Sequence, residues 1–488
     1  MRRLVVIENL RRWPLELEGA EVVLARSYLV DPAYSSMRGV AVFNLCREYR
    51  YPGLGYYVSL LATARGHRPL PTVATLQDLG AGPALQVVSD ELQDLIQSSL
   101  RPLRSDTFDL SVYFGRNLAK RYERLAKALF NAFPAPFIRA RFTRQTRWRL
   151  SSIKPISGDD IPEGHRPFVI EQATRYFAKR SSTSPRKHLR YDLAILWSPD
   201  DPEPPSNGGA IQRFTRAARD EGLDARLIGP DDYGRLAEFD ALFIRETTRL
   251  NHHTYRFARR AEAEGLVVID DPASILACTN KVYQAEIFAR HKIPTPRTLV
   301  VHEGNVNDVE RSVGLPCVLK RPDSAFSLGV TKISTAAALE TELTAILRGS
   351  PLVIAQAWAP STFDWRIGVL GGRPLFACRY HMVRGHWQIA SGAEGSARRY
   401  GRVEAVAFDD VPPAVLECGV RAARLIGDGL YGVDVKEVAG QALVIEVNDN
   451  PNIDAGYDDR VRKDELYREI ARYFREGLDR RGLSKESA

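Results

Sequence analysis

The residues best suited to chemistry lie in the segment 432–451, near the end of the chain. Two alternating polar and apolar runs there flank a short connection, residues 439–441, which predicts a β-hairpin. In that register Asp434 lies directly opposite Glu446, and Asn448 follows on the same face of its strand. The other face of this strand is expected to carry Leu443, Ile445 and Val447.

The two carboxylates need a partner, because like charges placed directly opposite each other on a sheet are destabilising. A divalent cation would offset them, and carboxylates with an amide oxygen are typical ligands of Mg²⁺. We therefore predict a metal site formed by Asp434, Glu446 and Asn448. The alternative is that Lys436, on the same face, neutralises the pair at a solvated edge.

Two lysines upstream could hold phosphate groups. Lys320 ends an apolar, strand-like run and precedes a polar loop, residues 321–329, that contains Ser324. A lysine at a strand end beside small residues can place its ammonium group on a phosphate. Lys281 lies in the first turn of a predicted helix, where a cation is unfavourable unless an anion is near. The alternative for both residues is an ordinary solvent-exposed lysine.

An aromatic segment and two arginines follow. An apolar run leads to Trp358, whose ring could form a flat slot for an adenine, although a buried core tryptophan is the alternative. In the next alternating run Asp364 and Arg366 share one face, and Arg379 lies in a second such run. Arginines on a sheet face that holds carboxylates could clamp a transferring phosphoryl group. They could equally form structural ion pairs.

A multidomain fold must position these residues, because 488 residues are too many for one small core. We expect three domains, with bounds 1–186, 187–275 and 276–482. Strand-like runs open the first domain at residues 4–7 and 22–24. In the middle domain strands and helices alternate, which predicts a parallel sheet covered by helices. The strands expected there are residues 192–197, 225–228, 240–244 and 266–269, and the helices are residues 209–220 and 255–264.

Composition excludes several classes of protein. Hydrophobic residues make up 44% and charged residues 26% of the chain, a mix typical of a globular protein. The five cysteines lie far apart with no CxxC pair, which argues against a disulfide framework or a zinc ribbon and for a reducing cytoplasm. No apolar run approaches the roughly 20 residues needed to span a bilayer. We therefore expect a cytoplasmic protein with no membrane partner.

The net charge of +8 is unevenly distributed. Residues 101–190 contain 20 Lys and Arg but only 7 Asp and Glu. Such a block indicates an anionic partner, whether a phosphate, an acidic peptide or nucleic acid, or else a set of solvated helix faces. Tyr113, Phe142 and Trp148 could stack on bases, but no nucleic-acid-binding signature is present, so the sequence argues against a nucleic-acid partner.

Taken in order, these features resemble the RimK-like and glutathione-synthetase-like branch of the ATP-grasp superfamily, over residues 187–480. The first stretch resembles the RimK-like ATP-grasp N-terminal (RLAN) domain, on the basis of residues 44–51 and 55–59. Two features depart from the family pattern: Ala357 follows the hinge glutamine where an acidic residue is usual, and the phosphate loop has only Gly329. The positions that match the family motifs are Lys281, residues 291–296, Lys320, Gln356, Asp364, Arg366, Asp434, Glu446 and Asn448.

The resemblance implies a multidomain fold of mixed α/β and α+β class. An N-terminal α+β domain would precede a Rossmann-like pre-ATP-grasp domain and a two-lobed ATP-grasp fold. The implied activity is ATP-dependent ligation of a carboxylate to an amine through an acyl phosphate, joining an amino acid to a peptide, a protein or a small carboxylate. ATP and Mg²⁺ would be required, with Mn²⁺ as an alternative metal, and homo-oligomers are left open.

The resemblance also assigns roles to single residues. Arg366 and Arg379 would be catalytic, and Asp434, Glu446 and Asn448 would bind the metal. Three alternatives stay open: a phosphotransferase that does not ligate, a nucleic-acid-binding protein that uses the basic block, and an adaptor with a decayed nucleotide site. The residues implied to contact the nucleotide are Lys281, Lys320, Ser324, Gln356, Ala357, Trp358 and Asp364.

Overall fold

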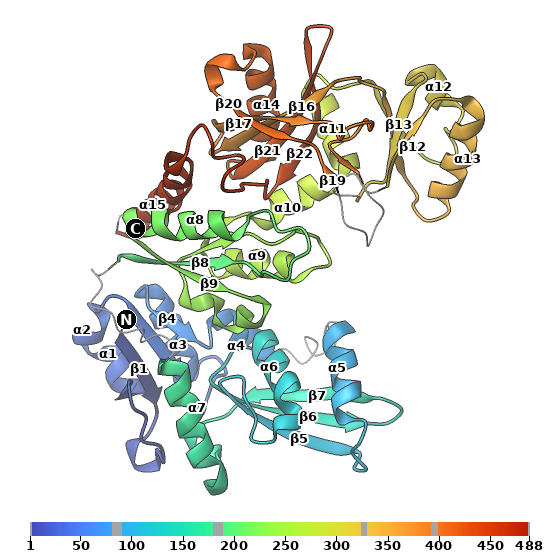
Figure 1. Cartoon of the computed structure of the whole chain (residues 1–488). Coiled ribbons are helices and arrows are strands. Elements are labelled where there is room, and N and C mark those ends of the chain that lie inside the picture. The colour runs from blue at the N-terminus through green and yellow to red at the C-terminus, as the bar shows by residue number, and fades with distance from the viewer. Residues whose placement is uncertain (1, 81–89, 179–188, 324–328, 392–398, 487–488) are drawn as a thin grey trace. The chain divides into compact units, whose positions relative to one another are not determined.

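The computed structural model describes residues 2–80, 90–178, 189–323, 329–391 and 399–486 (Figure 1). The chain forms two compact units. The first comprises residues 1–187 with residues 231–238, and the second comprises residues 188–230 with residues 239–488. The expected second and third domains thus lie in one unit, apart from the short segment 231–238, and the division between them stays a prediction.

The first unit begins with a four-stranded parallel sheet in the order β2-β1-β3-β4. The apolar end of β1 is buried on both faces, as is typical of an inner strand of a parallel sheet. The runs expected at residues 4–7 and 22–24 are confirmed as strands. The elements are β1 (Arg2–Ile7), β2 (Glu21–Leu24), β3 (Val40–Asn44), β4 (Arg68–Leu70), α1 (Ala25–Val30), α2 (Pro32–Ser35), α3 (Leu54–Ala64) and α4 (Val73–Gly80).

A three-stranded antiparallel sheet in the order β5-β6-β7 completes the first unit, with helices packed against it. Their apolar side chains share one core with residues of the parallel sheet. The antiparallel part fits the expected α+β class, and the parallel sheet adds an α/β half to it. The elements are β5 (Thr107–Tyr113), β6 (Phe137–Arg144), β7 (Trp148–Pro155), α5 (Asp90–Leu100), α6 (Glu123–Ala132) and α7 (Arg166–Ala178).

The aromatic residues of the basic block are part of this core. Tyr113 and Phe142 are fully buried and Trp148 is 2% exposed, so the expectation that they are available to stack on bases is wrong. Strand alternation explains the difference, because Phe142 faces the core while Arg141 faces outward and pairs with Asp109 at 2.8 Å. This part of the basic block is therefore a solvated sheet face rather than a set of helix faces.

The residues that carry the resemblance in the first stretch hold one loop against the parallel sheet. Nδ2 of Asn44 donates to the carbonyl oxygen of Gly55 at 2.6 Å and to Oγ of Ser59 at 2.9 Å. A Cβ atom on Gly55 would lie 2.7 Å from the carbonyl oxygen of Glu48. The close approach of the two segments therefore requires glycine at this position.

The second unit begins with the predicted parallel sheet, in the order β11-β10-β8-β9. All four strands and both helices expected from the alternation are confirmed, with small differences at their ends. The elements are β8 (Tyr191–Leu196), β9 (Leu223–Ile228), β10 (Ala241–Ile244), β11 (Val267–Ile269), α8 (Gly208–Asp220), α9 (His253–Ala263) and α10 (Pro272–Thr279).

Two antiparallel sheets of four and five strands follow, in agreement with a two-lobed architecture. The four-stranded sheet, in the order β12-β15-β13-β14, packs one face against α12 (Asp308–Ser312) and α13 (Ala336–Leu347). The five-stranded sheet, in the order β20-β17-β16-β21-β22, packs one face against α14 (Pro413–Ile426) and the other against a core that includes α8 and α15 (Asp464–Glu486). Their strands are β12 (Thr298–Val301), β13 (Cys317–Lys320), β14 (Val330–Ile333), β15 (Val353–Ala357), β16 (Phe363–Leu370), β17 (Arg373–His381), β20 (Val403–Val406), β21 (Leu430–Val438) and β22 (Gln441–Asp449).

The predicted hairpin is formed by β21 and β22, but its turn is shorter than expected. Ala439 and Gly440 form the connection, with φ angles of 50° and 77°. This two-residue turn alone would place Asp434 opposite Ile445. A bulge after Asp434 adds one residue to β22 and pairs Asp434 with Glu446. The predicted pair is therefore confirmed, whereas the predicted three-residue connection is wrong.

The bulge also changes which side chains of β22 face the core. Ala442, Val444 and Val447 are buried against α14, whereas Leu443 and Ile445 are only partly buried. A shift of one residue turns a side chain to the other face of a strand. The expected apolar face is thus wrong for Leu443 and Ile445 and right for Val447.

The structure adds two observations on features drawn from composition. The five cysteines are buried and free. No helix in the described part of the chain is both long and apolar enough to cross a membrane. The cytoplasmic location stays a prediction.

The turn of the hairpin gives the first testable prediction. The left-handed φ of Ala439 costs an L side chain roughly 1 kcal/mol, which glycine avoids. Replacing Ala439 by glycine should therefore raise the thermal unfolding midpoint, and Gly440→Ala should lower it. Differential scanning calorimetry of the two variants beside the wild type measures both shifts, and a rise for Gly440→Ala would contradict this turn.

Candidate active site

A cavity of about 230 Å³ lies beside the polar face of the four-stranded sheet. Side chains alternate along β13 and β15, so Lys320 and Gln356 face this cavity while Leu319 and Ala355 pack in the apolar core. The structure brings residues of α11 (Lys281–Arg290) and β22 to the same place. The charged and amide side chains that line the cavity include Lys281, Gln284, Lys320, Gln356 and Glu446.

Lys320 is buried, with 7% of its surface exposed, and is held by an amide. Its Nζ donates to Oε1 of Gln356 at 2.9 Å, and Nε2 of Gln356 donates to Oγ1 of Thr298 at 3.0 Å. Burial lowers the pKa of Lys320 to about 8, although the carboxylate of Glu446 opposes this shift. A buried ammonium group beside a neutral amide is well placed to meet an anion.

Lys281 lies in the first turn of α11, where the helix dipole disfavours a cation unless an anion is near. Its Nζ is 3.5 Å from Oε2 of Glu446, which supplies that anion. The side chain of Asn280 caps the helix by accepting the N–H groups of Val282 and Tyr283, both at 3.0 Å. The cap fixes where the helix begins and therefore where Lys281 lies.

Arg366 and Asp434 form a buried ion pair with two hydrogen bonds. Nε of Arg366 donates to Oδ1 of Asp434 at 2.5 Å, and Nη2 donates to Oδ2 at 3.1 Å. Nδ2 of Asn448 donates to the same Oδ2 at 3.2 Å. Because both charged groups are removed from water, the loss of either one would leave the other uncompensated.

The two carboxylates have pKa values shifted in opposite directions. Burial raises the pKa of Asp434 to about 6, although Arg366 opposes the shift. Burial also acts to raise the pKa of Glu446, but Lys281, Lys320 and Arg366 outweigh it, and this pKa lies below its ordinary value. Both carboxylates are therefore charged at neutral pH.

Gln284 holds the strand that carries Glu446 and Asn448. β22 is an edge strand, so the backbone groups on its outer side lack a neighbouring strand. Oε1 of Gln284 accepts the N–H of Val447 at 2.8 Å, and Nε2 donates to the carbonyl oxygen of Val447 at 2.9 Å. One side-chain amide thus replaces a strand partner between the two predicted metal ligands.

The predicted metal ligands lie together and suit a hard cation. Asp434 and Glu446 are cross-strand partners, and Asn448 contacts Asp434. Across the described residues, no group of three or more His, Cys, Asp and Glu side chains is arranged to hold a metal ion. Two carboxylates and one amide fit Mg²⁺, which usually keeps waters and takes further oxygen ligands from a nucleotide.

Arg379 does not reach this site. Across β16 and β17 it pairs with Trp365 and shares its face, whereas the adjacent Arg366 points to the opposite face of the sheet. Its guanidinium carbon lies 4.8 Å from the ring centroid of Trp365, and its Nη1 lies 3.7 Å from Oε1 of Glu404. Strand alternation therefore removes the geometric support for the predicted catalytic role of Arg379.

Asp364 and Ala357, both predicted to contact the nucleotide, have other partners. Asp364 forms an ion pair with Lys436, so the alternative in which Lys436 neutralises the hairpin carboxylates receives no support. The backbone N–H of Ala357 donates to the carbonyl oxygen of Arg297 at 2.8 Å. This donor is therefore not free for an adenine.

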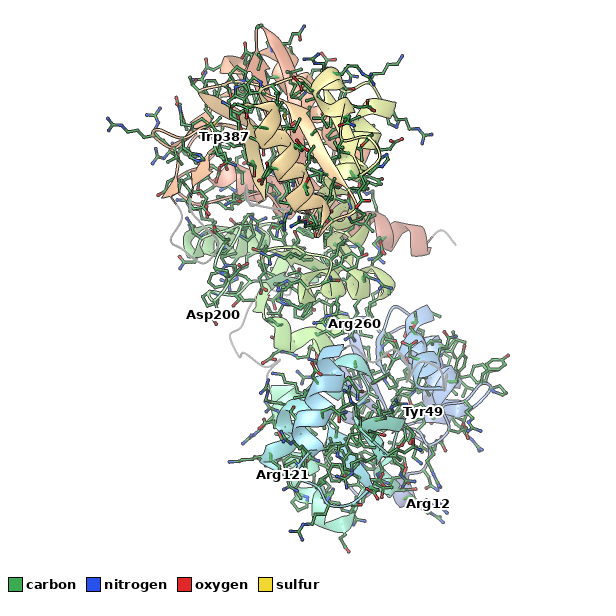
Figure 2. All side chains as sticks on the ribbon, turned by 90° about the vertical axis from the view of Figure 1, so that its right-hand side faces the viewer. Arg12, Tyr49, Arg121, Asp200, Arg260 and Trp387 are labelled. Carbon is green, nitrogen blue, oxygen red and sulfur yellow. The ribbon has the colours of Figure 1, made fainter. Side chains whose placement is uncertain are left out.

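The ring of Trp358 is also engaged. Nζ of Lys332 lies 3.8 Å from its centroid, and Trp387, labelled in Figure 2, meets it edge-on at 5.2 Å. The backbone N–H of Trp358 donates to the carbonyl oxygen of Pro316 at 3.1 Å. Ser324 and most of the predicted phosphate loop lie outside the described residues.

Tyr380 and Asp458 support Arg366 from behind and were not found from the sequence. The guanidinium carbon of Arg366 lies 4.8 Å from the ring centroid of Tyr380, whose hydroxyl donates to Oδ1 of Asp458 at 2.9 Å. Burial raises the pKa of Asp458 to about 6. The acidic run 454–459 was the available signal, but nothing in the sequence says which of its carboxylates faces Tyr380.

A second unexpected residue, Arg245, ties the hairpin to the parallel sheet. It is fully buried just after β10 and donates to Oδ1 of Asn450 at 2.7 Å and to the carbonyl oxygen of Pro451 at 2.9 Å. Oγ1 of Thr248 donates to Oδ2 of Asp449 at 2.6 Å. The segment after Asn448 is therefore anchored by residues about two hundred positions away.

One match to a known protein family lies in the first unit. Residues 25–172 match the family model described as the RimK-like ATPgrasp N-terminal domain. The match lies within the first unit, which we call the RLAN domain. The resemblance expected from residues 44–51 and 55–59 is confirmed, and the matched residues include β3 and β4 of the parallel sheet and all three strands of the antiparallel sheet.

The chain also has curated relatives. A probable alpha-L-glutamate ligase of Rhodopirellula baltica is 25% identical over 266 residues, which cover 50% of this chain and 63% of that protein. A protein of the same name from Vibrio vulnificus is 24% identical over 233 residues, covering 47% and 74%. The match thus spans less than two thirds of the first of these relatives.

Solved structures similar to this chain are more distant. A RimK domain ATP-grasp protein of Sphaerobacter thermophilus is 18% identical, with a TM-score of 0.44, and the match covers 58% of this chain and 98% of that one. The D-cycloserine synthetase DcsG is 18% identical, with a TM-score of 0.46 and coverage of 59% and 99%.

The lowered pKa of Lys320 predicts that nucleotide binding depends on pH. As the pH rises from 7 to 9, the ammonium group passes its pKa of about 8 and loses its charge, so its attraction for a polyphosphate falls. The affinity for ADP, measured by titration calorimetry, should therefore decrease over this range.

Lys320→Met should weaken ADP binding about tenfold or more and remove the pH dependence, since a charge-assisted hydrogen bond contributes about 1.5–3 kcal/mol. Lys332→Met, which removes a lysine of the neighbouring strand β14, is the control and should keep the pH dependence. Persistence of the full pH dependence in Lys320→Met would contradict the role of Lys320.

Proposed function

We propose that this chain is an ATP-dependent carboxylate–amine ligase that acts through an acyl phosphate. The observation that carries the proposal is the meeting of Lys281, Lys320 and Glu446 in one cavity. Asp434, the cross-strand partner of Glu446, is ion-paired with Arg366. The names of the curated relatives, probable alpha-L-glutamate ligases, support amide formation as the reaction.

The chemistry requires activation because a carboxylate is anionic and resonance-stabilised and does not react with amines. A carboxylate oxygen of the first substrate attacks the γ-phosphorus of ATP, and the bond to the bridging oxygen breaks, which releases ADP and leaves an acyl phosphate. The amine nitrogen then attacks the acyl carbon. Inorganic phosphate leaves with the electron pair of the C–O bond, and the nitrogen loses a proton to give the amide.

The residues of the site fit the needs of these two steps. Lys281 and Lys320 hold the phosphate groups by charge, and Gln356 fixes the position of Lys320. Arg366 stabilises the negative charge that develops on the transferred phosphoryl group and on the acyl oxygen; loss of one such donor commonly costs about 10²–10³ in rate. Asp434, Glu446 and Asn448 would hold Mg²⁺, or Mn²⁺ in its place. The metal ion would offset the charge of the nucleotide phosphates.

Glutamate is the amine substrate that we propose, because the relatives are named for its ligation. The carboxylate substrate is proposed to be a peptide, a protein or a small acid. The phosphotransferase alternative shares the first step and lacks the second, so the products decide between the two. The nucleic-acid alternative required exposed aromatic residues, but Tyr113, Phe142 and Trp148 are buried.

Replacing Glu446 by alanine should abolish ATP turnover, measured as ADP release in the presence of Mg²⁺, glutamate and pooled peptides. The change removes a predicted metal ligand and the carboxylate that pairs with Lys281. Glu437→Ala is the matched control, because Glu437 is an exposed glutamate on the same hairpin and should keep full turnover. Equal turnover in both variants would refute the assignment of the hairpin carboxylates.

Hydroxylamine should trap the activated intermediate. It attacks an acyl phosphate in place of the amine, so the carboxylate substrate becomes a hydroxamate in an ATP-dependent reaction that releases ADP and phosphate. Mass spectrometry should show the hydroxamate, and with glutamate in place of hydroxylamine it should show a new amide. A stable phosphorylated product that yields neither would favour the phosphotransferase.

A further inference from the structure

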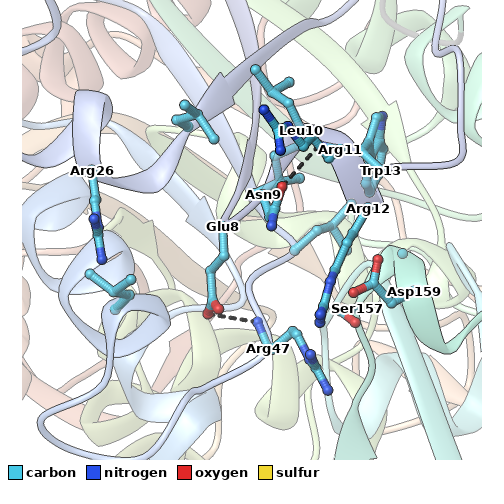
Figure 3. A pocket seen from close by; sticks show the side chains of 15 residues that line it. Glu8, Asn9, Leu10, Arg11, Arg12, Trp13, Arg26, Arg47, Ser157 and Asp159 are labelled. Atoms are coloured by element: carbon cyan, nitrogen blue, oxygen red, sulfur yellow. Dashed lines mark hydrogen bonds between the residues drawn. The ribbon is translucent and has the colours of Figure 1, made fainter.

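The RLAN domain contains a larger cavity than the one in the candidate active site. Its volume is about 630 Å³, and it lies where β1, β2 and β3 end (Figure 3). From β1 the chain passes to β2 on one side and then crosses to β3 on the other, so the strand order reverses at β1. In open parallel sheets, ligands bind outside the carboxyl ends of the strands at such a switch point.

Four arginines line this cavity. Arg11 and Arg12 follow β1, Arg26 follows β2, and Arg47 follows β3. All four are exposed, and within the described part of the chain no ion pair is recorded for their guanidinium groups. Glu8 and Asp159 are the acidic residues of the lining, so it carries an excess of two positive charges.

Figure 3 shows how the basic side chains lie. Arg12 and Arg47 extend toward the same end of the cavity, near Ser157 and Asp159, and Arg26 lies across from them. The guanidinium groups thus come from segments after three different strands. Each offers a planar fork of donors that matches a carboxylate or a phosphate.

Three backbone N–H groups beside the cavity, of the kind that hold phosphates at such sites, already have partners. Oε1 of Glu8 accepts the N–H of Arg47 at 2.9 Å and the N–H of Glu48 at 3.1 Å. Oδ1 of Asn9 accepts the N–H of Arg11 at 2.9 Å. A compact phosphate cradled by N–H groups is therefore disfavoured, whereas groups that reach the separate arginine side chains are favoured.

The remaining lining suits the stem of a peptide. Leu10, 54% exposed, and Leu54 contribute apolar surface beside the arginines. Trp13 packs so closely on Gly158 that a Cβ there would lie 2.6 Å from the ring, which fixes one wall. The volume falls within the range of about 300–1,000 Å³ typical of small-ligand sites.

We propose that this cavity binds a short acidic peptide segment, with carboxylate side chains on Arg12, Arg26 and Arg47. Separated carboxylates match guanidinium groups that come from different strands, and the peptide backbone lies over the apolar wall. The proposal concerns the RLAN domain alone and stands whether or not the second unit is a ligase.

Fluorescence polarisation of the full chain with a labelled tetraglutamate peptide tests this proposal. The peptide should bind, and a labelled tetraglutamine peptide should not. The double variant Arg12→Gln/Arg47→Gln should weaken binding about tenfold or more, as expected for the loss of charge-assisted hydrogen bonds. Arg26→Gln, which changes a residue after a different strand, should also weaken binding when it is the only change.

The matched control is Arg147→Gln/Arg149→Gln, which removes the same charge from exposed arginines of the same unit outside the cavity. It should change the affinity about twofold or less, as expected for a distant surface charge. Thermal unfolding of each variant separates loss of binding from loss of folding. Equal loss in both double variants would show general charge attraction and overturn the site.

Two competitors distinguish the source of the anion. Saturating ADP should not displace the peptide; displacement would place the peptide at the nucleotide cavity of the second unit and overturn the proposal. Unlabelled tetraglutamate should compete at lower concentration than inorganic pyrophosphate. If pyrophosphate competes at the lower concentration, and this competition is lost in Arg12→Gln/Arg47→Gln, the cavity is a phosphate site. That result would overturn the choice of a peptide.

Discussion

The candidate active site depends on one electrostatic constraint: charged groups removed from water must meet opposite charge nearby. Arg366 meets Asp434 through two hydrogen bonds, and Lys281 meets Glu446. Lys320 differs, because its recorded hydrogen bond goes to the neutral amide of Gln356. Burial lowers its pKa for this reason, and a polyphosphate in the adjacent cavity would supply the anion that the protein leaves out.

This balance of charge holds only if the strands carrying it keep their register. β22 lies at the edge of its sheet, where nothing in the sheet itself prevents a slip. Three contacts outside the sheet fix it: the amide of Gln284 on Val447, the carbonyl oxygen of Pro294 on the N–H of Val444, and Arg245 on the segment after the strand. Through Arg245, the parallel sheet of the second unit thus helps to hold the end of the hairpin.

The hairpin pairing and the parallel sheet of the second unit are predicted correctly from the sequence. The pairing of Asp434 with Glu446 was predicted from alternation, although a shorter turn and a bulge offset each other to produce it. The alternation of strands and helices also predicted the parallel sheet of the second unit. These successes rest on local patterns, which a single sequence contains.

The failures have the opposite origin. The sequence places Arg379 in an alternating run but does not contain the register of β16 and β17, and that register puts Arg379 on the other face of the sheet. The aromatic residues of the basic block are buried by an antiparallel sheet that the sequence pattern does not reveal, so their availability for stacking is predicted wrongly. Gln284, Asp458 and Arg245 act on residues far along the chain, and no spacing in the sequence connects them.

The two positively charged cavities differ in construction, and the difference implies different ligands. In the second unit, Lys320, Arg366 and Asp434 are buried, and Lys281 and Glu446 are partly buried. Their removal from water favours a compact, highly charged ligand whose charge offsets the cost of desolvation. In the RLAN domain the arginines are exposed and keep their hydration, so each contributes little alone and salt screens them. High affinity in this cavity therefore requires several carboxylates that bind at the same time. An acidic peptide carries such a set of carboxylates, whereas a nucleotide does not.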